Sequence, residues 1–233
     1  MAIVPPNAAG NVGGTRPVTN RRFYEDINPD SRCRSAPAAA RNREPIAEVL
    51  AKWLPAAGTV LEIASGTGEH VAFLAGQFPN LGWQPSDPHP DALASIAGWC
   101  EQSGLSNFNE PLTIDAAAAR WPIDSADVVL CINMVHISPW ASALGLLDGA
   151  ARLLAEGAPL ILYGPWIIDG VDTAPSNMAF DADLRSRDPR WGLRSLRDFR
   201  AEAEARGLMF EQCRTMPANN VMLLFRRSAP AAA

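Results

Sequence analysis

The chain has 233 residues, of which 48% are hydrophobic and 19% are charged, a composition ordinary for a globular protein with a sizeable core. Its formal net charge is −5 at pH 7, so there is no overall positive field to attract nucleic acid or an anionic membrane. No apolar run approaches the roughly 18 residues of a membrane-spanning helix, and the N-terminus lacks the pattern of a secretory signal, so neither a membrane protein nor a secreted one is expected.

The four cysteines, Cys33, Cys100, Cys131 and Cys213, are widely separated and form no C-x-x-C pair. This spacing argues against a zinc site and a disulfide framework, and it favours a reducing, cytoplasmic location. No two histidines have the spacing of metal ligands, so no metal is predicted.

The first segment, residues 1–20, is rich in Pro, Gly, Asn and Ala and has no hydrophobic periodicity, which predicts a disordered leader. Residues 21–228 show no internal repeat and no composition shift that marks a second domain, so one domain is expected there, followed by a short tail over 229–233.

A first helix is expected to begin at Asn42, whose side chain suits a helix cap, with Pro45 in its first turn. Apolar residues at helical spacing follow over residues 46–54, and Pro55 and Gly58 end the pattern.

A strand, a small-residue turn and a helix come next. Residues 60–63 indicate a short buried strand, residues 64–68 are all small, and the apolar spacing from Glu69 onward is helical. Such a turn exposes backbone N–H groups and lets a ligand approach closely, as in the first unit of nucleotide-binding α/β sheets.

The spacing of the turn separates the classes of nucleotide. A dinucleotide fingerprint needs a glycine three residues after Gly68, where Val71 stands, and the Lys-Ser/Thr of a Walker loop is absent. What remains is Glu62-x-Ala64-x-Gly66-x-Gly68, close to the E-x-G-x-G-x-G of Rossmann-type methyltransferases, with alanine at the first glycine. The pattern favours S-adenosylmethionine as the cofactor and, in that family pattern, an acid at Glu62 near its methionine end.

The next strand is expected over residues 81–84, stopping before Pro85, and it delivers Asp87 at its carboxyl end. Asp87 lies nineteen residues past Gly68, close to the interval of a ribose-binding acid. The alternative is a helix cap or turn aspartate before Pro88.

A third strand over residues 111–115 ends in Asp115, a candidate partner of the adenine amino group with Ala116 beside it; a plain turn residue is equally compatible. The remaining residues of the cofactor prediction lie in the turn and the helix start, at Ser65 and His70.

The fourth strand, over residues 126–132, is the most continuously apolar and is therefore expected at the centre of the sheet. It is followed by Asn-Met-Val-His-Ile-Ser-Pro-Trp, in which Asn133 and Met134 are assigned to the cofactor side. His136 is the candidate general base, because an unperturbed imidazole titrates near working pH; a buried histidine bonded to the backbone is the alternative.

A helix over 141–155 and a fifth strand over 159–163 continue the alternation, which predicts a parallel, doubly wound sheet. Residues 164–194 break the rhythm and are predicted to form a pocket for a small polar substrate, unless their polar groups satisfy one another. The side chains assigned to the acceptor are His136, Trp140, Tyr163, Asn177, Asp181 and Asn220.

The chain is expected to end in a helix capped by Ser195 and two strands, over 208–215 and 221–225. The strands are linked by Met-Pro-Ala-Asn-Asn, residues 216–220, in which Asn220 faces the acceptor or only forms a hairpin turn.

Several of these stretches together resemble the methyltransferase-like twenty-six proteins and their bacterial relatives, long labelled as a domain of unknown function. The matching stretches are residues 40–43, 61–68, 83–87, 132–140, 163–165, 176–177, 180–181 and 216–220. The resemblance implies a Rossmann-like class I methyltransferase fold with a seven-stranded, mostly parallel sheet whose last strand is antiparallel and whose faces both carry helices. It also implies that Arg41 and Asn42 cover the cofactor from the N-terminal side, and it implies no settled substrate.

The sequence therefore predicts an S-adenosylmethionine-dependent methyltransferase that acts on a small molecule, with no nucleic-acid or membrane partner and an undetermined oligomeric state. A non-catalytic module that binds S-adenosylmethionine to sense or scaffold is the alternative, and a nicotinamide-dependent oxidoreductase is disfavoured by the missing third glycine.

Overall fold

The computed structural model describes residues 25–26 and 32–229. The leader expected over residues 1–20 and the last four residues of the chain lie outside this range.

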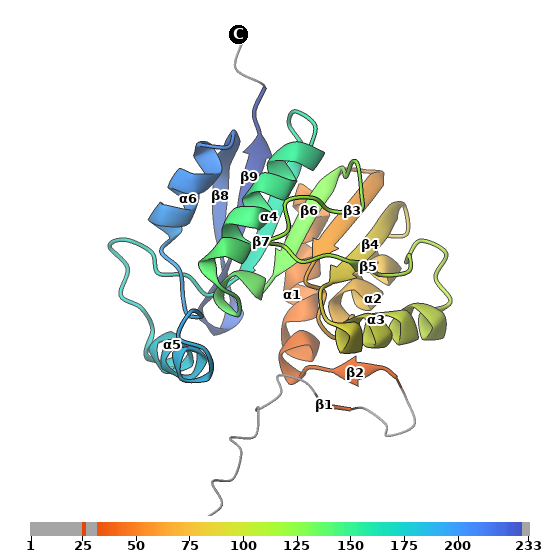
Figure 1. The fold of residues 1–233 in the computed structure, drawn as a ribbon, viewed down its shortest axis with the longest axis horizontal. Coiled ribbons are helices and arrows are strands. Elements are labelled where there is room, and N and C mark those ends of the chain that lie inside the picture. Colours follow the sequence, from red (N-terminus) through yellow and green to blue (C-terminus); the bar gives the residue numbers. More distant parts are fainter. Residues whose placement is uncertain (1–24, 27–31, 230–233) are drawn as a thin grey trace, which may run out of the picture.

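A seven-stranded sheet forms the centre of the molecule, in the spatial order β5-β4-β3-β6-β7-β9-β8 (Figure 1). The strands are β3 (Gly58–Ile63), β4 (Leu81–Asp87), β5 (Leu112–Thr113), β6 (Val128–Ile132), β7 (Pro159–Gly164), β8 (Leu208–Met216) and β9 (Asn220–Arg227). The strands from β5 to β7 pair in parallel, whereas β9 is antiparallel to both of its neighbours. The predicted fold, a mostly parallel seven-stranded sheet whose last strand runs the other way, is confirmed.

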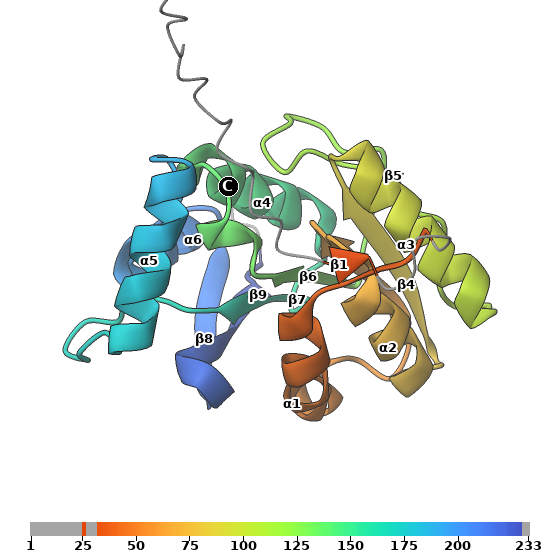
Figure 2. The ribbon, with the colours of Figure 1, turned by 90° about the horizontal axis from the view of Figure 1, so that it is seen from below.

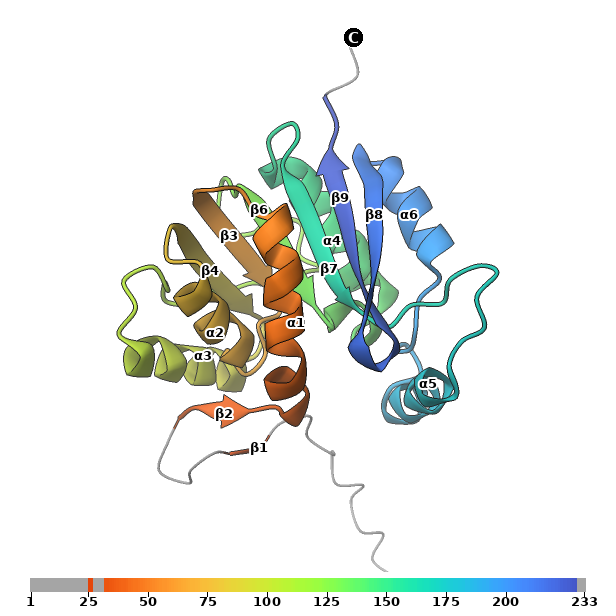
Figure 3. The same cartoon turned by 180° about the vertical axis from the view of Figure 1, so that it is seen from behind.

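Helices cover both faces of the sheet. They are α1 (Pro37–Trp53), α2 (Glu69–Gln77), α3 (Pro90–Ser103), α4 (Trp140–Leu153), α5 (Pro175–Arg187) and α6 (Leu196–Glu204). Buried side chains of α4 and α6 share one apolar cluster with the sheet, and those of α1, α2 and α3 share the other. Figure 1 shows α4 and α6 in front of the sheet, and Figure 3, seen from behind, shows α1 and α2 in front.

The parallel strands all end on the lower side of Figure 1, which brings their following loops together. The start of α1, the helix α5 and an antiparallel pair of two-residue strands, β1 (Glu25–Asp26) with β2 (Arg34–Ser35), lie on that same side (Figure 2). Strand β6 is fourth of the seven and buried along its whole length, so the expectation that residues 126–132 form the central strand is confirmed.

Two local predictions on the cofactor side are wrong. Helix α1 begins at Pro37 rather than at Asn42, because Pro37 suits the first turn of a helix and the chain then tolerates Pro45 inside it. The side chain of Asn42 is consequently not a cap but bonds His70 on the neighbouring helix.

The second wrong prediction is the end of β4, which runs through Pro85 to Asp87. The N–H and C=O of Trp83 bond Asn107 and Asn109, on the side of the strand away from β3. Pro85 has the same orientation as Trp83 because alternate residues of a parallel strand face the same neighbour. Its missing N–H therefore removes no bond to β3.

The irregular stretch after β7 contains a helix that the sequence pattern did not indicate. Helix α5 buries only Asn177 and Leu184, so it has almost no apolar stripe to detect. Two signals were present: a proline at its first position, and carboxylate–guanidinium pairs four residues apart, Asp181–Arg185 and Asp183–Arg187. The cap of α6 by Ser195 is confirmed, since its hydroxyl accepts a bond from the N–H of Asp198.

Candidate active site

The glycine turn after β3 uses left-handed backbone at three positions, Ala64 (φ 58°), Gly66 (φ 59°) and Gly68 (φ 84°). Gly68 is required on two counts, because a Cβ there would also lie 2.9 Å from the Cα of Ile96 on α3. Ala64 adopts this conformation with a side chain, at some backbone strain. At the position where the chain departs from the glycine pattern, alanine thus takes the left-handed conformation that favours glycine.

Asp87 at the end of β4 holds this turn in place. One carboxylate oxygen accepts a bond from the N–H of Gly66 and the other from the N–H of His89, both at 3.0 Å. The side chain is buried, and burial raises the pKa of the carboxyl group. Each oxygen keeps a second lone pair for a ligand. The aspartate thus makes a turn contact, as one alternative held, and also reaches across to the glycine turn.

Glu62, the acid of the sequence pattern, lies fully inside the protein at 1% exposure. Its Oε2 atom has no hydrogen-bond partner among the described residues. The pKa of this carboxyl is raised to about 7, chiefly by burial; a bond with Ser65 acts against the rise and the charge of Asp87 adds to it. A buried carboxylate oxygen without a partner is costly, so the site is suited to a cationic or N–H-bearing ligand group.

Ser65 and Ser86 join the ends of β3 and β4. Ser86 donates its hydroxyl to the carbonyl of Glu62 at 2.7 Å, and the N–H of Ser86 bonds the hydroxyl of Ser65 at 3.2 Å. The serine that the sequence assigned to the cofactor thus makes a contact within the protein.

His70 and Asn42 face each other from α2 and α1, with His70 Nε2 and Asn42 Oδ1 2.7 Å apart. Because an amide oxygen only accepts, Nε2 carries the proton in this arrangement. Burial, together with the charge of Arg43, lowers the pKa of His70 to about 4, so the ring is neutral. Arg41 is exposed, and it is Arg43 that lies near the turn, 3.7 Å from the carboxylate of Glu69.

Glu69, the first residue of α2, was not singled out from the sequence, yet it is buried and central to this side of the site. Its Oε2 accepts bonds from the hydroxyl of Ser35 and the N–H of Ala36, at 2.8 and 3.0 Å. The start of α1 is therefore tied to the glycine turn. The only hint of this role in the sequence was the position of a charged residue directly after the glycine turn.

Asp115 follows β5 and is exposed, and its side chain accepts a bond from the N–H of Ala117 at 2.9 Å. This is the turn geometry named as its alternative. Ala116 is buried, and α4 packs directly on it: a Cβ at Gly145 would lie 2.1 Å from the carbonyl oxygen of Ala116.

The loop after β6 begins with Asn133 in left-handed conformation (φ 65°), its N–H bonded to the carbonyl of Tyr163 at 2.9 Å. A short 3₁₀ turn, η1 (Met134–His136), follows and buries all three of its side chains. The ends of β6 and β7 are thereby locked together beside His136.

The imidazole of His136 is 3% exposed and lies between α5 and β7. The ring of Phe180 meets it edge-on with centroids 5.7 Å apart, and a Cβ at Gly164 would lie 2.7 Å from its Cε1. No described residue hydrogen-bonds the ring nitrogens. Burial and the charge of Arg194 lower the pKa of His136 to about 3, so the ring is neutral.

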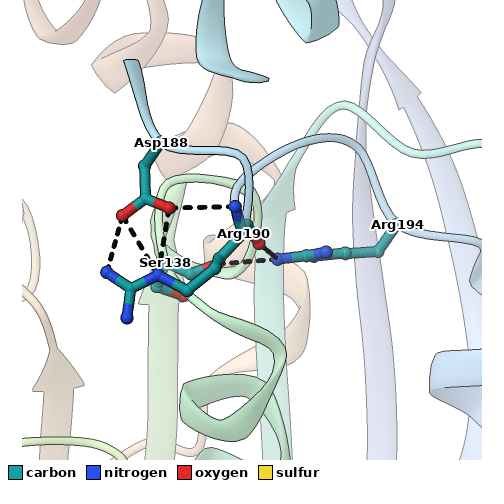
Figure 4. Close-up of polar contacts among 4 residues, drawn as sticks. All are labelled: Ser138, Asp188, Arg190 and Arg194. Carbon is teal, nitrogen blue, oxygen red and sulfur yellow. Dashed lines mark hydrogen bonds and ion pairs between the residues drawn. The ribbon is translucent and has the colours of Figure 1, made fainter. Parts of the chain in front are cut away.

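Arg194 fastens the loop after β6 to the segment after α5 (Figure 4). Its guanidinium donates to the carbonyls of Val135, Ser138 and Arg190, at 3.2, 2.7 and 2.7 Å. A backbone bond from Gly192 to the carbonyl of His136 adds a second link. The role of Arg194 was not predicted from the sequence, because hydrogen bonds to backbone carbonyls leave no recognisable residue spacing.

The other candidates for the acceptor have partners within the protein. Asn177 donates to the carbonyl of Asn219 at 2.9 Å, and Asn220 donates to the carbonyls of Pro217 and Ala218. Asp181 accepts bonds from the N–H of Leu193 at 2.7 Å and from Arg185 at 2.8 Å.

Two aromatic candidates flank this group. Trp140 begins α4 and packs edge-on against Phe199, with the guanidinium of Arg194 5.7 Å from its ring. Tyr163 is buried at the end of β7, where burial raises the pKa of its hydroxyl and Asn42 acts against that rise.

Within the described ranges, no cluster of three His, Cys, Asp or Glu side chains is arranged to hold a metal ion. Over the same residues no helix has the length and apolar character needed to cross a membrane. None of the four cysteines forms a disulfide.

Solved methyltransferase structures share this fold. An O-methyltransferase family protein from Burkholderia thailandensis aligns with 82% of the chain at 21% identity and a TM-score of 0.70. An O-methyltransferase family 2 protein from Planctomyces limnophilus, solved with apigenin, aligns with 81% at 22% identity and a TM-score of 0.66. Human N-acetylserotonin methyltransferase, solved with S-adenosylmethionine, aligns with 82% at 12% identity and a TM-score of 0.66.

The chain matches only a little over half of each of these proteins, 58%, 59% and 53% of their lengths respectively. At such identities the likeness shows the fold alone, a Rossmann-like methyltransferase fold. A family model described as "Protein of unknown function (DUF938)" matches residues 33–227. The chain belongs to this DUF938 family.

Proposed function

We propose that the chain is an S-adenosylmethionine-dependent methyltransferase, as its resemblance to the methyltransferase-like twenty-six proteins implies, and that it acts on a small polar acceptor, as the polar residues of 164–194 suggest. The observation that carries the proposal is the unpartnered Oε2 of Glu62, buried at the end of β3 beside the glycine turn. A cofactor with a cationic amino group and a sulfonium would supply what this oxygen lacks. When bound, it supplies an activated methyl group.

The charges around the turn favour this cofactor over a dinucleotide. The N–H of Gly66 is the kind of donor that a pyrophosphate requires, yet it already bonds the carboxylate of Asp87. Glu62 and Glu69 add two further buried carboxyl groups next to the turn. A pyrophosphate would be repelled there, whereas S-adenosylmethionine carries no phosphate.

The proposed cofactor residues are Arg41, Asn42, Glu62, Ala64, Ser65, Gly66, Gly68, His70, Asp87, Asp115, Ala116, Asn133 and Met134. Asp87 would accept bonds from the ribose hydroxyls through its remaining lone pairs. The acceptor side would comprise His136, Trp140, Tyr163, Asn177, Asp181 and Asn220, with His136 as the base only if the acceptor arrives protonated.

One observation favours the second candidate, a non-catalytic module that binds S-adenosylmethionine. Asn177 bonds Asn219, and Asp181 bonds Leu193 and Arg185. These polar side chains therefore have partners within the protein and do not by themselves require a methyl acceptor. Small-molecule partners only and a cytoplasmic location stay predictions from the sequence.

Calorimetric titration of the full chain with S-adenosylmethionine, its demethylated product and NAD tests the proposal. We expect binding of the first two, with a loss of at least tenfold in Glu62→Gln and in Asp87→Ala. Glu211→Gln serves as a matched control, because Glu211 is a surface carboxylate paired with Arg226 on β9. Binding of NAD alone, or equal affinity in all variants, would contradict the proposal. Methyl transfer to any member of a metabolite set then separates the enzyme from the sensor.

A further inference from the structure

The surroundings of His136 carry a positive charge and offer no carboxylate to the ring. Three elements pack against it: β7 contributes Gly164, α5 contributes Phe180, and the segment after α5 contributes the charge of Arg194. Neither Gly164 nor Phe180 titrates. Next to Phe180 lies Asp181, whose carboxylate is paired with Arg185 at 2.8 Å.

Arg194 is the charged residue near His136 whose charge is not balanced by an ion pair among the described residues. Its three bonds go to carbonyl oxygens, which are neutral, and it forms no ion pair with a carboxylate of the described residues. Asp181 lies near enough to act on it electrostatically but already has Arg185 as a partner. Counting Arg194, Arg185 and Asp181 together leaves one uncompensated positive charge beside a neutral imidazole.

Such a setting opposes proton transfer to His136. A histidine that serves as a base normally has a carboxylate hydrogen-bonded to its second ring nitrogen. This carboxylate orients the ring and stabilises the imidazolium that forms. Here both ring nitrogens lack a partner in the described part of the chain, and an imidazolium would form at a position only 3% exposed, close to a guanidinium. An alcohol acceptor, which must lose a proton on methylation, finds no suitable base in His136.

We propose that the acceptor is an anion, a carboxylic acid or a comparably acidic group that is ionised before it binds, and that Arg194 provides the positive potential that favours it near His136. This inference rests on the proposed function. An ionised acceptor has no proton to lose, so its methylation releases none. Methylation of an alcohol would release one proton for each methyl group transferred.

Binding of paired probes to the protein saturated with the demethylated cofactor product tests the inference. The probes are small aromatic and aliphatic carboxylates, beginning with benzoate and acetate, each compared with its primary amide. Shifts of the His136 ring signals in NMR spectra report binding at this site. We expect carboxylates to shift these signals at concentrations at least tenfold lower than their amides.

Charge variants connect the selectivity to Arg194. Arg194→Gln should weaken carboxylate binding at least tenfold, and Arg194→Lys should retain most of it. Arg197→Gln is the matched control, because it removes one positive charge three residues further along the chain, at the start of α6, where Arg197 forms an exposed ion pair with Asp169. If Arg194→Gln fails to fold, Arg185→Gln replaces it: this variant leaves Asp181 unpaired, cancels the excess charge and should weaken carboxylates likewise.

Equal binding of amides and carboxylates, no effect of any probe on His136, or equal losses in Arg194→Gln and Arg197→Gln would overturn the inference. Failure of the cofactor product to bind at all would instead refute the proposed function, so the two failures are distinguishable. A second readout is the pKa of His136 itself, which should rise in Arg194→Gln and remain unchanged in Arg197→Gln.

Discussion

Replacing Glu62 by glutamine should stabilise the unliganded protein, and the gain should depend on pH. The carboxyl has a pKa of about 7 in the folded chain, against 4.5 for an ordinary glutamate. At pH values between 4.5 and 7, Glu62 is therefore protonated in the folded state and ionised in the unfolded state. Stability consequently falls as pH rises from 4.5 to 7, and the whole penalty is present above pH 7.

The size of the penalty follows from the same shift. A displacement from 4.5 to about 7 corresponds to about 3 kcal/mol in the free energy of unfolding. Glutamine is never charged and escapes this cost. We therefore expect the advantage of Glu62→Gln over the wild type to be about 3 kcal/mol larger at slightly alkaline pH than near pH 4.5.

Urea denaturation of both proteins at pH 5 and pH 8.5 measures this difference. Any effect of glutamine on packing is the same at both values and cancels, as do the contributions of His70 and His136, which both proteins share. Glu211→Gln makes the same substitution at a partly exposed carboxylate and serves as the control. An equal gain at both pH values would refute the reasoning, because it would mean that Glu62 is not buried as a costly charge.

Three further outcomes are expected. Gly164→Ala should cost about 1–3 kcal/mol by overpacking and should shift the NMR signals of His136, because its Cβ would lie 2.7 Å from the ring; an unchanged spectrum would contradict the geometry. His136 has a folded pKa of about 3 against 6.5, so its contribution to stability is complete above pH 6.5 and is lost as pH falls towards 3. His136→Gln should flatten the acid limb of the unfolding profile, and an equally steep limb would count against this burial. Pro85→Ala should cost only about 0.5 kcal/mol in urea denaturation, through the unfolded state, since no ladder bond to β3 is regained; a gain in stability would contradict this reading.

The order of elements along the sheet was accessible from the sequence because it depends on hydrophobic periodicity and on a few turn residues. The continuous apolar run of β6 predicted its central place, and Ser195 predicted the start of α6. Helix α5 escaped because polar residues cover it, and its stability comes from ion pairs along the helix and from contacts such as the bond from Asn177 to Asn219. A pattern of burial cannot reveal an element that buries little.

The candidate site was predicted as separate residues, and what the sequence lacked was their contacts. Asp87 was predicted to bind the ribose of the cofactor. Its bond to Gly66 was not predicted, because the two residues are twenty-one positions apart and the bond leaves no local pattern in the sequence. The role of Asn42 was misplaced for the same reason, because its partner His70 lies on another helix. Arg194 was missed entirely, since backbone carbonyls exist at every residue and therefore leave no mark in a sequence.

The two ends of the candidate site have opposite electrostatic character, and this ordering explains the ligands proposed for each. Glu62, Asp87 and Glu69 surround the glycine turn with buried carboxyl groups. Around His136, by contrast, Arg194 leaves a positive excess. A cationic cofactor on the first side and an anionic acceptor on the second would each meet complementary charge, and exchanging them would place like charges together in a low-dielectric site. The same asymmetry would discriminate against a phosphate-bearing cofactor and a protonated acceptor, so the signs of these few charges restrict both ligands at once.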